Sequence, residues 1–416
     1  MRDDGAITRR MPGYRVTILT LDAHAASACR RVAERLSPEF PGLTVSLHAA
    51  AEWGETPGAF ERAVEAVEQG DIVIANLLFL EEHVKPILPH LEARRDQCDA
   101  MAGVIADASI VKLTRMGTLD MAAPESGMRK LIKRLRGSSK PSSDSGESKM
   151  RMLRRLPKIL KYIPGKAQDL RAWFLVMQYW LGGSDDNIEA MLRFLISRYC
   201  RHEGWRGGEA PAPVEYPEVG LYHPDLAERI TEDAAALPAP EGAKGTVGIL
   251  MMRSYVLSGD TAHYDAVIRA LEAKGLRVLP AFAGGLDGRP AMARFFRDEA
   301  GARIDALLSL TGFSLVGGPA YNDSEAAVEV LKGLDVPYLA AHPLEFQTLA
   351  QWAGSPQGLG PIETTMLIAL PELDGATNPC VFAGRHGTEP CQGCRYACRV
   401  EQESRDMAPC HERIDS

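Results

Sequence analysis

Five of the eight cysteines of this chain lie in its last 37 residues, in a spacing that could hold a metal centre. They are Cys380, Cys391, Cys394, Cys398 and Cys410, and the central three form the run Cys-Gln-Gly-Cys-Arg-Tyr-Ala-Cys. These short gaps let consecutive thiolates turn toward one inorganic centre, and Cys410 could supply a fourth sulfur. Four sulfurs suit an iron–sulfur cluster or a structural zinc ion, with His411 as a substitute ligand and free thiols as the remaining alternative.

The rest of the composition indicates a protein of the reducing interior of the cell. Cys29, Cys98 and Cys200 are far apart, unlike the dense cysteines of a small secreted disulfide domain. The apolar runs are much shorter than the roughly twenty residues of a membrane helix, and the run after the early twin arginine is too short for a cleaved signal. A net charge of -8 argues against bulk nucleic-acid binding. We expect a soluble, cytoplasmic protein without a membrane span or a nucleic-acid partner.

One stretch of the chain is strongly basic. Between Arg129 and Lys166 there are 13 lysines and arginines against two acids, Asp144 and Glu147. Its middle, residues 137–149, is rich in Ser, Gly and Pro and lacks apolar residues, which predicts a mobile linker. The flanking charges are read as a solvated helical face, with docking of an acidic partner or an anionic substrate as the alternative.

The elements that would position any site alternate between buried strands and amphipathic helices. In the first part of the chain, apolar runs at 14–21, 43–48, 71–78 and 102–106 predict strands, and helical spacing predicts helices at 23–36 and 57–69. Parallel sheets use the loops at the carboxyl ends of their strands. His24 and Asp107 follow such strands, but surface or capping roles are the more ordinary reading for both.

The second part repeats this alternation after a helical stretch. Helices are predicted at 150–160, 168–181 and 186–199, then strands at 246–252, 276–281, 304–310 and 336–341, with helices at 261–274, 290–299 and 322–334 between them. Two turns, 253–259 and 310–318, carry glycines that could cradle an anionic ligand. Neither matches a dinucleotide or Walker pattern, so plain turn chemistry is favoured.

These patterns predict an α/β fold. It comprises two doubly wound, parallel-sheet units of the flavodoxin-like kind, joined by a helical connector and followed by a Cys-rich carboxyl segment. The predicted boundaries are 1–136 for the first α/β domain, 137–149 for the linker, 150–242 for the connector, 243–370 for the second α/β domain and 371–416 for the Cys-rich segment.

Four strings in this order resemble one family. They are Tyr14-Arg-Val-Thr-Ile-Leu-Thr-Leu-Asp-Ala-His24, the run 71–83, Val247-Gly-Ile-Leu-Met-Met-Arg-Ser254, and Pro371-Glu-Leu-Asp-Gly375 before the cysteines. Together they resemble the amino-terminal part of the large, porphyrin-binding component of magnesium chelatases of the bacteriochlorophyll type, the H subunit. The large subunit of cobalt chelatases is similar to the second half, but the first α/β module and the basic stretch favour the magnesium family.

The resemblance implies a porphyrin-binding subunit of an ATP-dependent magnesium chelatase that inserts Mg²⁺ into protoporphyrin IX in bacteriochlorophyll biosynthesis. The ATP would be hydrolysed by two AAA+-type motor subunits, which agrees with the absence of a Walker motif, and the next enzyme of the pathway is a further expected partner. Family members are much longer, and their catalytic carboxylate is expected beyond Ser416. We therefore assign no catalytic residue and expect this chain to be an inactive truncated part.

The resemblance also directs attention to two sets of residues. Glu372 and Asp374 of the Pro-Glu-Leu-Asp-Gly turn are candidates for substrate binding, with plain turn formation by Asp374 and Gly375 as the alternative. By position, Cys391, Cys394, Cys398 and Cys410 match a cysteine run thought to carry a four-iron cluster in some photosynthetic bacterial members, with zinc as the alternative. Such a cluster would sense oxygen or redox state. The alternative function is a non-catalytic iron–sulfur or zinc-binding regulatory or docking module of a tetrapyrrole chelatase of the cobalt type.

Overall fold

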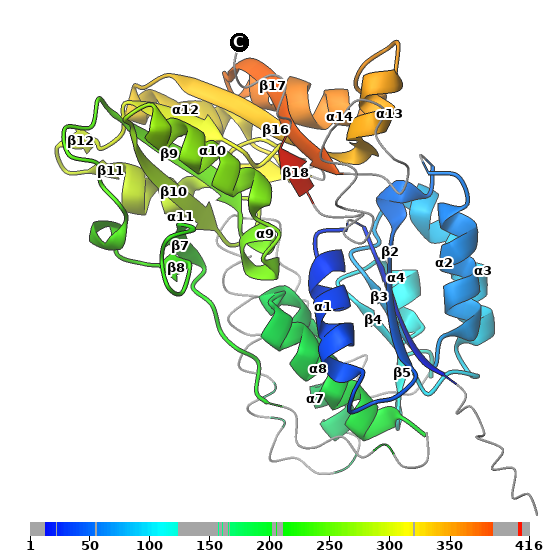
Figure 1. Ribbon diagram of the computed structural model, residues 1–416. Helices are drawn as coiled ribbons and strands as arrows, with labels where there is room; N and C mark the ends of the chain where they lie inside the picture. Colours follow the sequence, from blue (N-terminus) through cyan, green and yellow to red (C-terminus); the bar gives the residue numbers. More distant parts are fainter. Residues whose placement is uncertain are drawn as a thin grey trace, which may run out of the picture. The chain divides into compact units, whose positions relative to one another are not determined.

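The computed structural model divides into two compact units. Unit 1 contains Met1–Ala23 and Ala28–Val214, and unit 2 contains His24–Ser27 and Glu215–Ser416. Figure 1 shows the helices and strands of both units. The residues that the structure describes are 13–21, 23–54, 56–123, 157, 160, 165, 167–201, 205, 211–318, 321–385 and 407–409.

Unit 1 is built on a six-stranded sheet in the order β2-β1-β3-β4-β5-β6. Four strands run parallel, and two short ones pair antiparallel at the edge. The bounds are β1 Tyr14–Thr20, β2 Leu43–Ala49, β3 Ile72–Asn76, β4 Ala100–Val104, β5 Arg115–Met116 and β6 Leu119–Asp120. Every residue of β3 and β4 is buried, as expected for central parallel strands covered on both faces. The four parallel strands confirm the strands predicted from the apolar runs.

Helices cover both faces of this sheet. Figure 1 shows α2 and α3 on one face and α1, α7 and α8 on the other. Their bounds, with those of the short elements, are α1 Ala26–Leu36, η1 Ala50–Glu52, α2 Ala59–Gln69, α3 Glu81–Arg94, α4 Ala108–Lys112, α7 Ala167–Gly182 and α8 Asp185–Tyr199. The predicted helices at 168–181 and 186–199 are therefore confirmed, whereas the predicted helix at 150–160 falls almost entirely outside the described residues.

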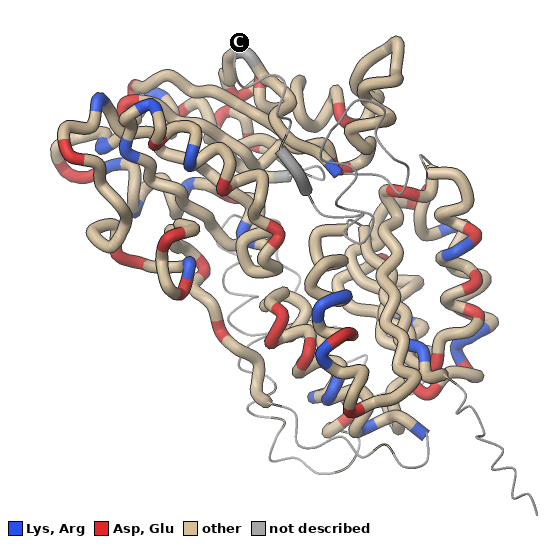
Figure 2. The backbone as a smooth tube through the Cα atoms, in the orientation of Figure 1, with Lys and Arg blue, Asp and Glu red and all other residues tan. Residues whose placement is uncertain are grey.

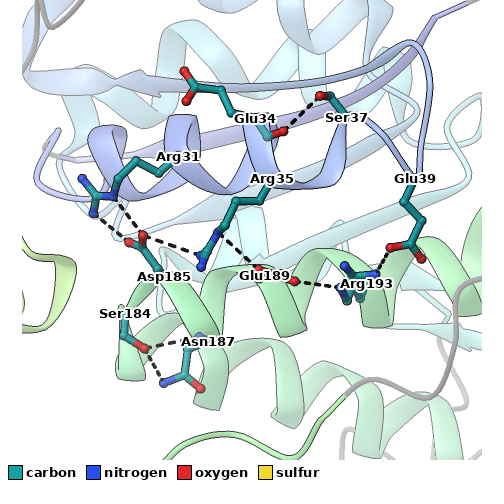
Figure 3. Close-up of polar contacts among 10 residues, drawn as sticks. All are labelled: Arg31, Glu34, Arg35, Ser37, Glu39, Ser184, Asp185, Asn187, Glu189 and Arg193. Carbon is teal, nitrogen blue, oxygen red and sulfur yellow. Dashed lines mark hydrogen bonds and ion pairs between the residues drawn. The ribbon is translucent and has the colours of Figure 1, made fainter.

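The helices α7 and α8 are fastened to the sheet and to α1 by polar contacts. The indole N–H of Trp173 in α7 donates to the carbonyl of Gly103 in β4 at 2.9 Å. On α8, Asp185 accepts from the guanidinium of Arg31 at 2.7 and 2.9 Å, and Glu189 lies 3.4 Å from Arg35, as Figure 3 shows. These contacts make α7 and α8 part of unit 1, and the domain boundaries drawn from the sequence stay a prediction.

Unit 2 is built on an eight-stranded sheet in the order β18-β17-β16-β13-β9-β10-β7-β8. The five central strands are parallel, and antiparallel strands close both edges. The bounds are β7 Val219–Tyr222, β8 Ile230–Thr231, β9 Thr246–Met252, β10 Arg277–Ala283, β13 Ala306–Ser309, β16 Tyr338–Thr348, β17 Thr377–Arg385 and β18 Met407–Pro409. The four strands predicted for this half are confirmed. The strand β17 extends the same sheet into the stretch 371–416, which the sequence pattern assigned to a separate segment.

Short elements connect these strands. They are η2 Ala234–Ala236, α9 Arg253–Ser258, α10 Ala262–Ala273, α11 Arg289–Ala291, η3 Met292–Phe296, β11 Arg297–Asp298, β12 Gly301–Ala302, β14 Gly317–Gly318, β15 Tyr321–Asn322, α12 Ser324–Leu334, α13 Leu349–Gly354, α14 Pro361–Glu363, η4 Thr364–Ala369 and α15 Leu370–Leu373. The predicted start of α12 is confirmed, because the side chain of Asp323 accepts from the backbone N–H of Ala326 at 3.0 Å.

The core of unit 2 lies on both faces of its sheet. Alternate residues of β9 and β10 enter two clusters: Leu250 and Leu279 pack with Phe296 and Ala327, whereas Ile249 and Val278 pack with Tyr264. Alternation of this kind is the period of a strand, so α10 and α12 cover opposite faces. Among the described residues of both units, no helix is long and apolar enough to cross a membrane. The expected α/β class with mainly parallel sheets is confirmed.

Candidate functional site

The sheet of unit 2 reverses its strand order beside β9. From β9 the chain moves to β10 on one side and then to β13 on the other. In open α/β sheets, ligands bind outside the carboxyl ends of the strands at this kind of reversal, because the two following loops part there. The residues after β9, β10 and β13 are therefore the first candidates for a site.

A pocket opens at this place. It is small and partly open to solvent. Its walls come from the end of β9, from the glycine-containing loop after β10 and from the loop after β13: Leu250, Met251, Met252, Ala283, Gly285, Leu286, Asp287, Gly288, Thr311, Phe313, Ser314 and Leu315. The lining is mainly apolar, with two methionines and one aromatic ring, which suits an apolar group better than a phosphate.

The two charged groups at the rim, Asp287 and Arg289, are paired with each other. Figure 2 shows how the charged residues of the chain are distributed along its backbone. The carboxylate of Asp287 accepts from Arg289 Nε at 2.9 Å and from Arg289 Nη2 at 2.6 Å. It also accepts from the backbone N–H of Arg289 at 3.0 Å, which holds the turn at the start of α11. Leu286 beside them is 41% exposed. An entering group therefore meets an apolar edge next to a neutralised ion pair.

The two loops that form the walls are joined by two backbone hydrogen bonds. The carbonyl of Leu315 accepts from the backbone N–H of Gly288 at 2.8 Å, and the carbonyl of Leu286 accepts from Gly317 N at 2.7 Å. The backbone N–H of Leu315 donates to Asp374 Oδ2 at 2.7 Å. The predicted turn at 310–318 is thus one wall of a pocket and is held from behind.

The two candidate carboxylates of the Pro-Glu-Leu-Asp-Gly turn behave differently. Glu372 is exposed at the end of α15 and does not line the pocket. Asp374 is only 1% exposed and points inward to the backbone of Leu315. Burial raises the pKa of Asp374, although the hydrogen bond from the backbone N–H of Leu315 opposes the rise. The turn itself is also present, because Gly375 has a φ of 100° that favours glycine.

The other glycine-containing turn, at residues 253–259, is not a cradle. Residues Arg253–Ser258 form the helix α9, and Gly259 ends it with a φ of 71°. The guanidinium of Arg253 donates to the carbonyls of Pro217 at 2.9 Å and Tyr216 at 3.2 Å. Plain local structure, the favoured reading of this turn, is therefore confirmed.

At the carboxyl edge of the sheet of unit 1, Asp107 has an ordinary structural role. Its side chain accepts from the backbone N–H of Ser109 at 2.8 Å and caps α4. Those hydrogen bonds, led by the Ser109 hydroxyl, lower the pKa of Asp107. His24 is half-buried in the turn before α1. The capping role favoured for Asp107 is confirmed, and the surface role favoured for His24 stays a prediction.

Two buried ionisable residues near the pocket were missed by the sequence analysis. His342 in β16 is 1% exposed, and burial lowers its pKa to about 4, so the ring is neutral near pH 7. Glu363 accepts from the backbone N–H groups of Phe346 and Gln347, both at 3.0 Å, and burial raises its pKa. His342 follows the predicted strand at 336–341, which was the available signal. No pattern in the sequence indicated Glu363.

The cysteines Cys391, Cys394, Cys398 and Cys410 lie outside the described residues. Cys380 is described and is exposed on β17. Among the described residues, no group of three or more His, Cys, Asp or Glu side chains is placed to hold a metal ion. The predicted metal centre therefore stays a prediction.

Comparison with known proteins gives two family matches and several relatives. The model described as "CobN/Magnesium Chelatase" matches residues 177–416, and a domain of unknown function matches residues 15–174. The magnesium-chelatase H subunit of Cereibacter sphaeroides is 65% identical over 408 residues, which are 97% of this chain and 34% of that protein. The corresponding protein of Rhodobacter capsulatus is 61% identical over 98% of this chain and 34% of its own length.

A more distant relative covers about half of the chain. The aerobic cobaltochelatase subunit CobN of a Sinorhizobium species is 30% identical over 204 residues, which are 47% of this chain and 15% of that protein. The chain spans about a third of the length of the two magnesium-chelatase relatives.

Proposed function

This chain belongs to the CobN/magnesium chelatase family, and we propose that it is a porphyrin-binding, amino-terminal part of the H subunit of an ATP-dependent magnesium chelatase. In this proposal the complete enzyme inserts Mg²⁺ into protoporphyrin IX for bacteriochlorophyll synthesis. The observation that carries it is the 65% identity with a magnesium-chelatase H subunit over 97% of the chain. The strand orders around β1 and β9 support the further proposal that both sheets are flavodoxin-like.

The pocket at the carboxyl end of β9 is the proposed contact for the macrocycle. Its mainly apolar lining suits the methyl and vinyl substituents at one edge of a porphyrin, not the whole ring. The propionates would stay outside, because the guanidinium of Arg289 at the rim is bound to Asp287. Metal insertion needs carboxylates or histidines that take up pyrrole protons, and we assign that role to no residue of this chain.

A porphyrin titration tests the proposal. Protoporphyrin IX is added to the chain while the absorption of the porphyrin and the tryptophan fluorescence are recorded. Four of the five tryptophans, Trp53, Trp173, Trp180 and Trp205, belong to unit 1, and Trp352 belongs to unit 2. We expect saturation near one equivalent and quenching of Trp352, so that a Trp352→Phe variant loses most of the quenching but none of the affinity.

A pair of matched variants locates the contact. Leu286→Asp places a charge on the apolar rim of the pocket, which we expect to weaken porphyrin binding about tenfold or more, because the charge loses its water. Ile362→Asp changes another exposed aliphatic residue of unit 2 that does not line the pocket. It should leave the affinity unchanged. A flat titration of the unchanged chain would contradict porphyrin binding and favour the alternative, a docking module of a chelatase.

The remaining partners are also part of the proposal. The chain contains no Walker motif, which supports ATP hydrolysis on separate AAA+-type motor subunits, with the next enzyme of the pathway as a recipient of the product. We also propose a cytoplasmic location.

A four-iron cluster on Cys391, Cys394, Cys398 and Cys410 is proposed as a redox sensor, with zinc as the alternative. Iron and acid-labile sulfide, measured after purification without oxygen, should be present in the unchanged chain and in Cys380→Ser. Both should be lost in Cys394→Ser. Zinc without sulfide would make the cysteines a structural clasp, and equal iron in both variants would exclude this set of ligands.

A further inference from the structure

A buried carboxylate stands behind one wall of the pocket of unit 2. We propose that Asp374 is a positioning residue that holds the loop after β13 against the loop after β10. The role of Asp374 in holding the walls stands on geometry alone. Its consequence for porphyrin affinity rests on the proposed function.

The contacts form one continuous chain of hydrogen bonds. Asp374 Oδ2 accepts from Leu315 N at 2.7 Å, and the carbonyl of the same Leu315 accepts from Gly288 N at 2.8 Å. The two loops meet again where Gly317 N donates to the carbonyl of Leu286 at 2.7 Å. Leu286, Gly288 and Leu315 all line the pocket, whereas Asp374 does not. Asp374 therefore acts on the pocket through the backbone of Leu315, whose N–H it binds and whose carbonyl binds Gly288.

A carboxylate suits this task because its charge strengthens the bond. A hydrogen bond to an ionised acceptor is roughly twice as strong as a neutral one. Asp374 is 1% exposed, so the bond is shielded from competing water. Removal of the acceptor would leave the N–H of Leu315 buried without its partner, so the loop after β13 would lose the contact that fixes it from behind. That loop is thus held by a residue that follows it by 59 positions.

The groups that face Asp374 leave its charge without a strong opposing partner. Its atom Oδ1 is buried without a hydrogen-bond partner among the described residues, and the nearby Asp323 at the start of α12 is a like charge. Burial raises the pKa of Tyr338 on β16, and the charge of Asp374 adds to the rise. Burial also raises the pKa of Asp374 itself, so its charged form is less favourable here than on an exposed aspartate.

Amide hydrogen exchange measures the wall directly. The unchanged chain, Asp374→Ala, the conservative variant Asp374→Asn and the control Asp335→Asn are compared at pH 7. Asp335 is an exposed aspartate of the same unit that ends α12 in the left-handed conformation, which Asn also accepts. We expect exchange about fivefold faster in Asp374→Ala, confined to peptides that contain Leu286–Gly288 and Thr311–Val316.

The conservative variant separates positioning from a merely structural role. In Asp374→Asn the side-chain oxygen can still accept from Leu315 N, so protection of the two loops should be largely recovered in this variant but not in Asp374→Ala. If Asp374→Ala did not fold, Asp374→Glu, which moves the acceptor by one methylene group, should show faster exchange in the same two loops. Equal exchange in all the proteins, or faster exchange throughout unit 2, would overturn the proposal.

Porphyrin affinity gives the second readout. If the proposed function holds, the dissociation constant for protoporphyrin IX should rise about fivefold in Asp374→Ala and stay unchanged in Asp335→Asn. A failure of the unchanged chain to bind porphyrin would contradict the proposed function, and the exchange of the two loops would then decide the role of Asp374. Altered exchange with unaltered affinity would show that these walls do not contact the porphyrin.

Discussion

Each unit contains a nearly buried aspartate that holds a turn, and the two are stabilised in different ways. In unit 1, Asp169 of α7 accepts from Thr118 N at 2.8 Å, from Arg198 Nη2 at 2.8 Å and from Tyr199 Oη at 3.1 Å. In unit 2, Asp374 accepts from the backbone N–H of Leu315 at 2.7 Å, has no hydrogen-bond partner at Oδ1 within the described part of the chain and lies near another aspartate, Asp323. Burial raises the pKa of both groups, but hydrogen bonds from Thr118 and Arg198 outweigh it for Asp169, whose pKa is lowered.

The difference indicates that Asp169 is a fixed structural contact, which we call the brace, whereas the charge of Asp374 is only partly compensated. Asp169 joins the turn between β5 and β6 to α7 and α8, and Gly117 of that turn lies so close that a Cβ atom there would be 2.8 Å from Asp169 Oδ2. A fully paired carboxylate of this kind fixes one geometry. Asp374 carries a charge that its surroundings tolerate poorly, and it lies behind a pocket. A poorly compensated buried group is more often found near functional sites than in a pure brace.

The largest expected effect is the loss of the brace. Asp169→Ala would leave the guanidinium of Arg198 and the N–H of Thr118 without their acceptor, which should lower the free energy of unfolding of unit 1 by about 3 kcal/mol. Urea unfolding followed by tryptophan fluorescence reports mainly on unit 1, because four of the five tryptophans belong to it. The exposed Asp186 on α8 provides the control, and Asp186→Ala should change the value by less than about 0.5 kcal/mol. Equal effects of both variants would contradict the brace.

A smaller effect is expected from the contact between α7 and the sheet. Trp173→Phe keeps most of the buried ring but removes the donor to the carbonyl of Gly103. A lost hydrogen bond that leaves a buried acceptor unpaired costs about 1–2 kcal/mol, so unit 1 should lose that much. The companion variant Trp180→Phe, on the same helix, controls for the smaller ring. If it proved equally destabilising, the loss would reflect packing and not the hydrogen bond.

A change of pH should affect the stabilities contributed by Asp169 and Asp374 in opposite directions. The folded pKa of Asp169 is lowered, so its contribution to stability is present above its unfolded pKa of about 4 and is lost as the pH falls through the folded value. The folded pKa of Asp374 is raised, so unit 2 loses stability as the pH rises from about 4 to the folded value. Relative to the unchanged chain, Asp374→Asn should therefore gain stability with rising pH and Asp169→Asn should lose it. Calorimetry from pH 3 to pH 8 measures both trends, and trends of the same sign would refute the assignment.

Much of the fold could be predicted because both units rely on local patterns. Central parallel strands are continuous apolar runs, and β1, β3 and β9 stand out for that reason. The strand β17 was missed, since Thr377-Asn-Pro-Cys-Val-Phe-Ala-Gly-Arg385 contains Pro379 and Gly384 and stands next to the cysteines. Helix starts were predicted less well: α2 begins at Ala59 after Gly58, not at Thr56 and Pro57.

The site could be predicted only in part because its contacts join distant segments. The loop after β13 was recognised from its glycines and its place after a strand. The pocket also needs the loop after β10, whose contribution depends on the strand order around β9 and not on any local motif. For Asp374 the local signal of Asp-Gly indicated a turn, and that is correct. Its bond to Leu315 depends on how the end of α15 lies beneath another loop, which no spacing in the sequence encodes.

The smallest expected effect lies at the surface between α1 and α8. Arg31 binds both oxygens of Asp185, but their side chains are 39% and 28% exposed, so water and salt compete for the charges. Arg31→Ala should lower the stability of unit 1 by only about 0.5–1 kcal/mol, and Arg31→Lys should recover part of it because the charge remains but the forked geometry is lost. Urea unfolding in low salt and in about 0.5 M salt, a level at which exposed pairs are strongly screened, separates this contact from the brace. The effect of Arg31→Ala should shrink in high salt, whereas the effect of Asp169→Ala should persist, because only the second pair is shielded by burial and hydrogen bonds. If both effects shrank alike, Asp169 would be a surface charge in energetic terms, and the contrast with Asp374 would lie in exposure and not in pairing.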